Sequence, residues 1–392
     1  MVFPVDLTLF EGTAHSPSFL DLSRSMGRPG LTLRDYCIPV NPYFPTPAMF
    51  DELRRGLEES LKYYPSPNED LTRLLCRTIG LDPASVVLAN GSTELITWID
   101  RLFVKGGLAT PVPTFGRWTD QPAETGKAVA TFGTTPEDHF ALDVDCFAAF
   151  VRRSGARAAA LCNPNNPTGA LVPRDQVVRL LELLADLEIV VIDESFIDFA
   201  DVETVPSVAR EAAERPNVVV LKSLGKNFGL HGVRFGYAVA RPRLIAIVRQ
   251  ALPHWNVNGV AEAVIRSLAG HMGEYERGRR RVIRDRQALE DALRGVEGLR
   301  VFVSRANFVY TRVPDEIDGV GLRNRLLTEH RCFVRECGNK LGSDHHYFRI
   351  AARPSEAIPS LIEALQDCLA AQTRASRTAA RESESALSFT RS

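Results

Sequence analysis

The chain lacks the features that mark several classes of protein. No run approaches the roughly 18 apolar residues that a membrane-spanning helix needs. The N-terminus, MVFPVDLTLFEG, has no basic segment followed by an apolar run and a small-residue cleavage site, so we expect no signal peptide. Neither sign of charge dominates, because 47 Lys and Arg stand against 48 Asp and Glu. We therefore expect no nucleic-acid or membrane partner.

Cysteine is scarce as well. The 7 cysteines are odd in number and scattered, and they form no CxxC pair, so we expect reduced thiols and no metal site. With 392 residues and 45% apolar residues, the chain can bury a core without disulfides or a metal ion. These features predict a cytoplasmic globular protein of two or three structural units, at about 150 residues per domain.

Short β-rich runs alternate with helical patterns in the middle of the chain. Strand-like runs occupy 158–161, 188–192, 218–221 and 233–240. This alternation predicts a mostly parallel sheet covered by helices on both faces. A long helical pattern then runs from Gly259 to about Gly295. After it come the strand-like runs LRVFV, NFVYT, CFVRE and YFRIA, with two helices near 319–329 and 355–371.

The same patterns predict how the chain divides. We expect a large three-layer α/β domain over 48–275 and a smaller α+β domain over 276–370. Residues 1–47, rich in Pro, Gly and Ser, are expected to form an N-terminal arm on the small domain or on a partner subunit. The small, polar segment 371–392 is expected to be a disordered tail.

Five polar or glycine-rich loops follow the expected strands. They are NGSTE at 90–94, PTF at 113–115, NPNNPTG at 163–169, DESF at 193–196 and SLGK at 223–226. Ligands of open parallel sheets bind at the carboxyl ends of the strands, so these loops predict one site. Three common sites are excluded, because the chain has no GxGxxG after an early strand, no complete P-loop around Gly225-Lys226, and no GxSxG.

The spacing of Asn166, Asp193, Ser223, Lys226 and Arg234 resembles the pyridoxal 5′-phosphate (PLP)-dependent fold-type I aminotransferases of class I/II. SLGKNFGLHGVRFGY is the most specific segment, and NPNNPTG and DESFIDF add two independent matches. The resemblance is strongest to the branch of histidinol-phosphate aminotransferases and threonine-phosphate decarboxylases. The segments shared with that branch are YYPSPNEDL, NGSTELI, PTFGRW, PHWNVNGVAEA, ANFV, FVRECGN and YFRIAAR, between about 41 and 353.

The resemblance implies a role for each cofactor-binding residue. Lys226 would form the Schiff base with PLP and move protons at the substrate's Cα. Asp193 would pair with the pyridinium nitrogen, Asn166 would donate to O3′, and Phe115 would stack on the ring. The phosphate would take donors from Gly91, Ser92 and Thr93 at a helix N-terminus, from Ser223 and Arg234, and from Tyr64 of the neighbouring subunit. Such sharing implies a homodimer.

Two arginines resemble the family's substrate-binding residues. Arg349, in YFRIA, would hold the substrate's α-carboxylate in a bidentate pair. Arg335, in FVRECG, would contact a distal acidic or phosphate group, and Arg353 is a weaker third candidate. By default, four further polar or aromatic residues near the site are assigned to packing or to its entrance: His231, Trp255, Asn256 and Asn258.

The chain departs from the family at two places. Phe196 stands where many of its transaminases have a tyrosine that donates to O3′, and DESFIDF and NVNGVAEA look more like the threonine-phosphate decarboxylases. The HGG segment with which those decarboxylases bind phosphate has no counterpart in EGTAHSPSFLDLSRSMGRPG, which argues against threonine phosphate as the substrate.

The resemblance predicts an aminotransferase that takes a small amino acid or amino-acid phosphate and a keto-acid co-substrate. A decarboxylase and a β-eliminating lyase of secondary metabolism remain alternatives, because the bond at Cα that stands perpendicular to the cofactor ring is the one that breaks. A non-catalytic sensor would usually carry a DNA-binding domain or lack the lysine, whereas Lys226 is present and the first 45 residues are too short and irregular for a helix-turn-helix.

Overall fold

The structure is a computed structural model that describes residues 3, 5–11, 16–25, 33–202 and 206–389, with 375–389 described by their backbone alone. Parts of the expected arm and the last three residues of the expected tail lie outside these ranges. The chain divides into two compact units. The large unit comprises Val40–Arg284 and Ser304–Asn307, and the small unit comprises Met1–Pro39, Asp285–Val303 and Phe308–Ser392.

The large unit is built on a seven-stranded sheet of the described residues, in the order β2-β8-β7-β6-β5-β3-β4. Its strands are β2 (Val86–Ala89), β3 (Leu108–Val112), β4 (Val129–Gly133), β5 (Ala158–Cys162), β6 (Ile189–Asp193), β7 (Val218–Ser223) and β8 (Gly236–Val239). Only β8 pairs antiparallel, with β2 and β7. The four predicted strands and the mostly parallel sheet are therefore confirmed.

Both faces of this sheet are buried. In β6, Val190 and Ile192 belong to one apolar core, whereas Ile189 and Val191 belong to another. Successive side chains of a strand point to opposite faces, so each core covers one face. A strand buried on both sides needs apolar residues at every position, which explains the continuous apolar runs in the sequence.

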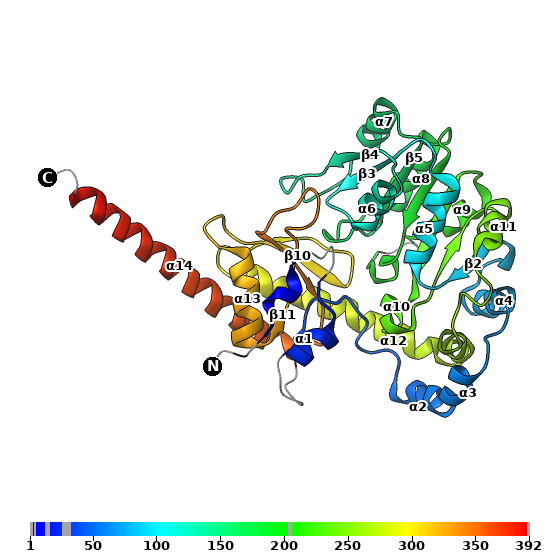
Figure 1. Cartoon of the computed structure of the whole chain (residues 1–392), viewed down its shortest axis with the longest axis horizontal. Coiled ribbons are helices and arrows are strands. Elements are labelled where there is room, and N and C mark those ends of the chain that lie inside the picture. The colour runs from blue at the N-terminus through cyan, green and yellow to red at the C-terminus, as the bar shows by residue number, and fades with distance from the viewer. Residues whose placement is uncertain (1–2, 4, 12–15, 26–32, 203–205, 390–392) are drawn as a thin grey trace. The chain divides into compact units, whose positions relative to one another are not determined.

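Helices supply the layers that cover the sheet, and most of them are labelled in Figure 1. They are α2 (Pro47–Arg55), α3 (Leu57–Lys62), α4 (Asn68–Ile79), α5 (Ser92–Phe103), α6 (Arg117–Glu124), α7 (Val144–Ser154), α8 (Arg174–Leu183), α9 (Ala209–Glu214), α10 (Leu224–Asn227), α11 (Pro242–Ala251) and α12 (Gly259–Arg294). No helix in the described ranges is long and apolar enough to cross a membrane.

The small unit pairs β1 (Arg34–Asp35) with β11 (Cys332–Phe333) in parallel and forms a second, antiparallel sheet. That sheet has the order β12-β13-β10-β9, from β9 (Arg300–Phe302), β10 (Phe308–Arg312), β12 (Arg335–Glu336) and β13 (Tyr347–Ala351). Its helices are α1 (Phe19–Ser25), α13 (Gly319–His330) and α14 (Ile358–Phe389). The α+β character agrees with the sequence pattern.

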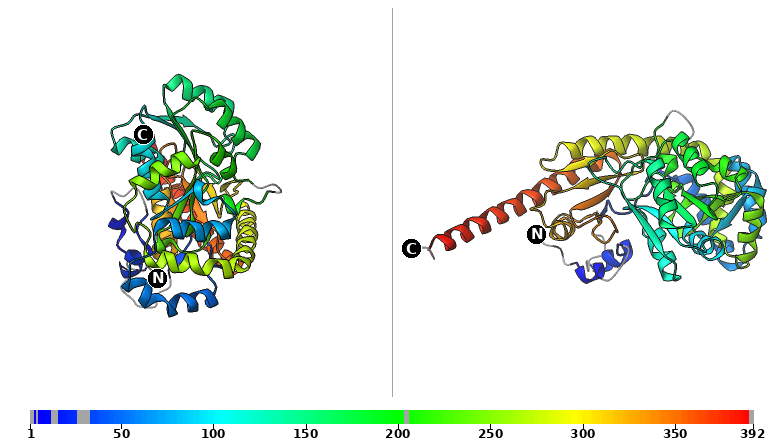
Figure 2. Two further views of the ribbon diagram at one scale, coloured as in Figure 1. Left: turned by 90° about the vertical axis from the view of Figure 1, so that its right-hand side faces the viewer. Right: turned by 90° about the horizontal axis from the view of Figure 1, so that it is seen from above.

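Two boundaries differ from those expected. The units divide at Pro39/Val40 and Arg284/Asp285. The second division falls inside α12, which Figure 2 shows as one unbroken helix, so the sequence offers no loop to mark it. Helix α14 continues to Phe389, through most of the segment expected to be disordered. That segment is rich in Ala, Arg and Glu, which favour helix even where no apolar face guides the prediction.

Candidate active site

The carboxyl ends of the central strands carry the predicted polar loops. Cys162 ends β5 and is the register partner of Asp193, which ends β6. Ser223 ends β7 and pairs with Gly236 at the start of β8. Because β5, β6 and β7 run parallel, the loops that follow them leave from the same edge of the sheet.

A cavity at this edge brings together four of the predicted residues. It is lined by Phe115, Cys162, Pro164, Asn166, Asp193, Ser195, Phe196 and Lys226. The Lys226 Nζ atom lies 5.2 Å from the centre of the Phe196 ring. The amine that the sequence predicts to react therefore sits against an apolar ring that is itself buried.

Asp193 is a buried carboxylate held by neutral donors. The residue is only 4% exposed. Oδ1 accepts from the Ser195 backbone N–H at 3.1 Å and from Ser195 Oγ at 2.6 Å, while Oδ2 accepts from Trp118 Nε1 at 3.2 Å. None of the ion pairs in the described residues includes Asp193, although buried charges are normally paired. A protonated pyridine nitrogen would supply the missing cation.

A second group of backbone and side-chain donors lies at the start of α5. Gly91 has φ +79°, and a Cβ there would lie 2.6 Å from the Arg234 Nη2 atom. At Gly236 a Cβ would lie 3.0 Å from the Ser92 backbone N. The guanidinium of Arg234 and the first N–H of α5 thus converge where only glycine fits. This cradle has the donors that a phosphate needs, so the residues of the large unit fit PLP.

The small unit places Arg335 and Arg349 side by side. They are register partners on β12 and β13, so their side chains leave the sheet on the same face. Arg335 donates to Ser16 Oγ at 2.8 Å and to Asn339 Oδ1 at 2.6 Å, and Arg349 donates to the Cys37 carbonyl at 2.8 Å. Burial lowers the pKa of the Arg349 guanidinium, and the nearby charge of Arg335 adds to the effect.

Other candidates have partners within their own unit. Arg353 pairs with Asp35 at 3.1 Å, inside the small unit. Asn256 donates to Glu94 and Asn258 to the Val233 carbonyl, which are structural bonds. Tyr64 does not line the cavity at the strand ends. Its residue is 79% exposed, and its ring stacks on Trp255 with the ring centres 4.4 Å apart.

The sequence interpretation missed two side chains that touch Asp193. Ser195 lies two residues after the aspartate, and a bond from that position back to an Asp side chain is a common turn. That spacing could have revealed it. Trp118 lies 75 residues from Asp193 in the sequence, and nothing in PTFGRW indicates where its indole points.

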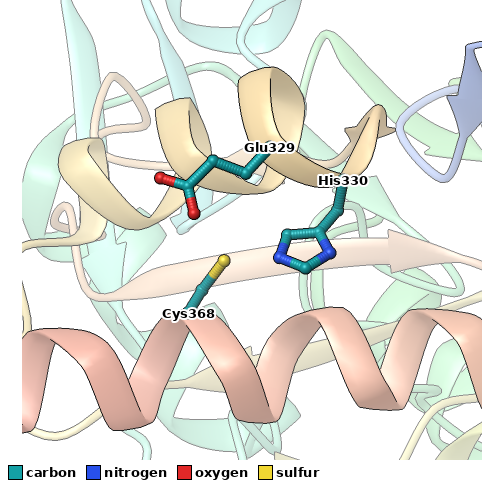
Figure 3. Close-up of side chains that lie close together, drawn as sticks. All are labelled: Glu329, His330 and Cys368. Carbon is teal, nitrogen blue, oxygen red and sulfur yellow. The ribbon is translucent and has the colours of Figure 1, made fainter. Parts of the chain in front are cut away.

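One group of possible metal ligands was found in the described residues, and it lies in the small unit. Figure 3 shows Glu329 and His330 at the end of α13, facing Cys368 on α14. Both Glu329 oxygens accept from Arg325, and His330 Nε2 lies 3.1 Å from Asp367 Oδ2. Burial raises the pKa of the Cys368 thiol to about 12. These groups already have partners, so we assign no ion to them.

Comparison with known proteins agrees with this geometry. The family model "Aminotransferase class I and II" matches residues 35–365. An L-serine phosphate decarboxylase of Sulfurospirillum multivorans is 31% identical over 91% of this chain and 93% of its own length. A histidinol-phosphate aminotransferase of Ruminiclostridium cellulolyticum is 27% identical over 75% of this chain and 81% of its own.

The solved structures point the same way. The structure of a decarboxylase from Sulfurospirillum multivorans superposes with a TM-score of 0.82, at 31% identity, over 91% of this chain and 93% of that one. The predicted fold type I architecture and the predicted cofactor are thereby confirmed. The chain belongs to the class I and II aminotransferase family and is an enzyme that depends on PLP.

Proposed function

We propose that the protein is a PLP-dependent decarboxylase of an α-amino acid that carries a phosphate group on a short side chain. The observation that carries this proposal is the similarity to an L-serine phosphate decarboxylase, which extends over nearly the whole of both chains. The sequence favoured an aminotransferase and kept decarboxylation as the alternative. The comparisons support the alternative better.

Phe196 gives independent support. The ring is 3% exposed and faces Lys226 Nζ, at the position where many transaminases of the family have tyrosine. Phenylalanine cannot donate a hydrogen bond, so it leaves Asn166 as the proposed donor to O3′ and makes the surroundings of the lysine less polar. The sequence had already associated this residue with the decarboxylase side of the branch.

The neighbouring arginines support a substrate with two anionic groups. Like charges directly opposite one another on two strands repel, unless an anion lies between or beside them. A carboxylate and a phosphate would neutralise both guanidinium groups of Arg335 and Arg349 through paired hydrogen bonds. Arg335 also lines a cavity of about 610 Å³ within the small unit, together with Ser16, Asn339 and Arg323.

The cofactor, when bound, supplies an electron sink for the pair of a bond broken at the substrate's Cα. The residues of the chain decide which bond that is. Arg335 and Arg349 would hold the phosphate and orient the carboxylate, so that the bond between Cα and the carboxylate would be the one that breaks. CO₂ would leave without the electron pair, and Lys226 Nζ would deliver a proton to Cα.

A panel of amino acids tests the proposal directly. PLP-loaded protein is mixed with L-serine phosphate, L-threonine phosphate and unphosphorylated amino acids, without any keto acid, and the products are followed by mass spectrometry. We expect an amine and CO₂ from a phosphorylated amino acid, with the cofactor still present as PLP. A keto acid together with pyridoxamine phosphate would refute decarboxylation.

Transamination remains the second candidate, because the family also contains histidinol-phosphate aminotransferases that match three quarters of this chain. It shares the phosphate-bearing substrate with the first proposal but requires a keto acid to regenerate the cofactor. The same panel distinguishes the two reactions, because only transamination stops after one conversion per cofactor when no keto acid is present.

We also propose that the enzyme is a homodimer and that Tyr64 completes the phosphate cradle of the partner subunit. Apolar side chains are exposed around Tyr64 in the large unit, which is unusual for a monomer: Leu57, Leu61, Tyr63 and Trp255. Coexpression of Tyr64→Ala and Lys226→Ala chains tests this sharing. Mixed dimers would regain one intact site of two, about a quarter of all sites after random assembly. No regained activity would place Tyr64 in its own subunit's site.

A further inference from the structure

The indole of Trp118 donates a hydrogen bond to the carboxylate of Asp193. The indole is almost completely buried on α6, in the core that covers one face of the large sheet. Its Nε1 atom lies 3.2 Å from Asp193 Oδ2. An indole N–H only donates, so it cannot exchange roles as a hydroxyl can. Its partner oxygen must therefore accept.

The donors around Asp193 are distributed unevenly between its two oxygens. A carboxylate oxygen has about two acceptor positions. Oδ1 already accepts two hydrogen bonds, both from Ser195. Oδ2 accepts one N–H, from Trp118, and its other neighbour is the Cys162 thiol at 3.9 Å. Because thiols are weak donors, the second acceptor position of Oδ2 is the one that a stronger donor can occupy.

We propose that Trp118 is a positioning residue, whose indole N–H fixes the Asp193 carboxylate so that Oδ2 accepts from the protonated pyridine nitrogen of PLP. This inference rests on the proposed role of Asp193 in the same site. Without the indole, the carboxylate keeps its Ser195 bonds but is free to turn Oδ2 away. The ring nitrogen then loses the partner that keeps it protonated.

The variant Trp118→Phe tests this, because it keeps an aromatic ring in the core and removes only the N–H and part of the ring volume. The readout is the ¹⁵N chemical shift of PLP labelled at its ring nitrogen, together with the dissociation constant of PLP. We expect the shift to move toward that of an unprotonated pyridine. We also expect the dissociation constant to rise by about 10-fold or more, the effect of losing one hydrogen bond to a charged group.

Two further variants serve as matched comparisons. Trp98→Phe makes the same substitution on α5, at a partly buried indole outside the cavity, and should leave the ¹⁵N shift at its wild-type value. Ser195→Ala removes the hydroxyl that donates to Oδ1, but Oδ1 still accepts from the backbone N–H of residue 195. Because Oδ1 does not face the cofactor in this arrangement, Ser195→Ala should change the shift less than Trp118→Phe does.

The possible outcomes separate this inference from the proposed function. A wild-type protein that binds no PLP would overturn both. Normal PLP binding, with the same shift and affinity in Trp118→Phe as in the wild type, overturns the role of Trp118 alone, as does a larger effect from Ser195→Ala. If Trp118→Phe does not fold, wild-type protein with ¹⁵N-labelled indoles replaces it. In a chain that carries both Trp98→Phe and Trp255→Phe, the one remaining indole signal is that of Trp118. It must shift when PLP is added, and its failure to shift overturns the inference.

Discussion

The two units of the chain differ in the sign of the charge at their candidate binding residues: a carboxylate in the large unit and two guanidinium groups in the small unit. In the large unit, the Asp193 carboxylate accepts hydrogen bonds from the Ser195 backbone, the Ser195 hydroxyl and the Trp118 indole, and no ion pair within the described ranges includes it. In the small unit, Arg335 and Arg349 stand opposite each other on adjacent strands, so two like charges share one face of a sheet. The large unit is thus prepared for one positively charged group, and the small unit for anions.

This contrast has energetic consequences. Donors on both oxygens of a buried carboxylate reduce the cost of its desolvation, so the free protein already tolerates Asp193. Two adjacent guanidinium groups repel each other, and an anion bound beside them would reduce this repulsion. We therefore expect the loss of Asp193 and the loss of Arg335 to lower activity alike but to change stability in different directions.

The largest expected effect is that of Lys226→Ala in the large unit. The change removes the proposed covalent attachment and the proton donor at Cα, so we expect turnover to fall by roughly 1,000-fold or more while the fold is kept. Turnover assays with circular dichroism of the same sample measure both. Turnover close to that of the wild type would contradict the assignment.

Asp193→Ala should come second. It removes the partner of the pyridine nitrogen, and we expect the bond-breaking step to slow by about 3 kcal/mol, roughly 100-fold. Single-turnover kinetics at saturating PLP isolate that step. If the rate stays within a few-fold of the wild-type rate, Asp193 is only a turn residue.

Arg335→Gln sharpens the comparison in the small unit. We expect kcat/KM for the phosphorylated substrate to fall by roughly 100-fold, because a charged hydrogen-bonding partner is lost. The free energy of unfolding without ligand should stay the same or rise by up to about 1 kcal/mol, because the repulsion from Arg349 disappears.

Arg353→Gln is the matched stability control, because it breaks the ion pair with Asp35 and should destabilise the free protein. Urea denaturation compares the two variants. An Arg335→Gln protein that loses as much stability as Arg353→Gln would show that the hydrogen bonds of Arg335 to Ser16 and Asn339 outweigh any repulsion from Arg349.

The smallest effect concerns Glu194, the residue after Asp193. Burial raises the pKa of its carboxyl to about 7, above its ordinary value, despite bonds from Ser207 and Val208. The folded chain therefore keeps a proton that the unfolded chain has lost, and stability falls as the pH rises from about 4.5 to about 7, then levels off. Glu194→Gln should flatten this slope and gain on the order of 2 kcal/mol at pH 8.

Denaturation at several pH values measures this, with the exposed Glu214→Gln on α9 as the control. A slope equal to that of the wild type would show that Glu194 titrates normally.

The sequence predicted most of the large unit because local signals and tertiary structure agree there. The apolar runs of β5 to β7 and the helical pattern of α12 reflect burial directly. The residues lining the cavity follow from loops at strand ends. In contrast, the pairing of Arg335 with Arg349 depends on strand register, and the contact of Trp118 with Asp193 joins distant segments, so neither has a local signature.

The most direct test of the proposed decarboxylation is the number of CO₂ molecules released from the substrate per bound PLP when no keto acid is present. L-serine phosphate labelled with ¹³C in its carboxyl group is added in large excess to PLP-loaded protein, and ¹³CO₂ and the amine product are counted per cofactor. A decarboxylase would give many turnovers, with equal amounts of CO₂ and amine. One conversion per cofactor, with no CO₂ and with pyridoxamine phosphate as the final form, would contradict it.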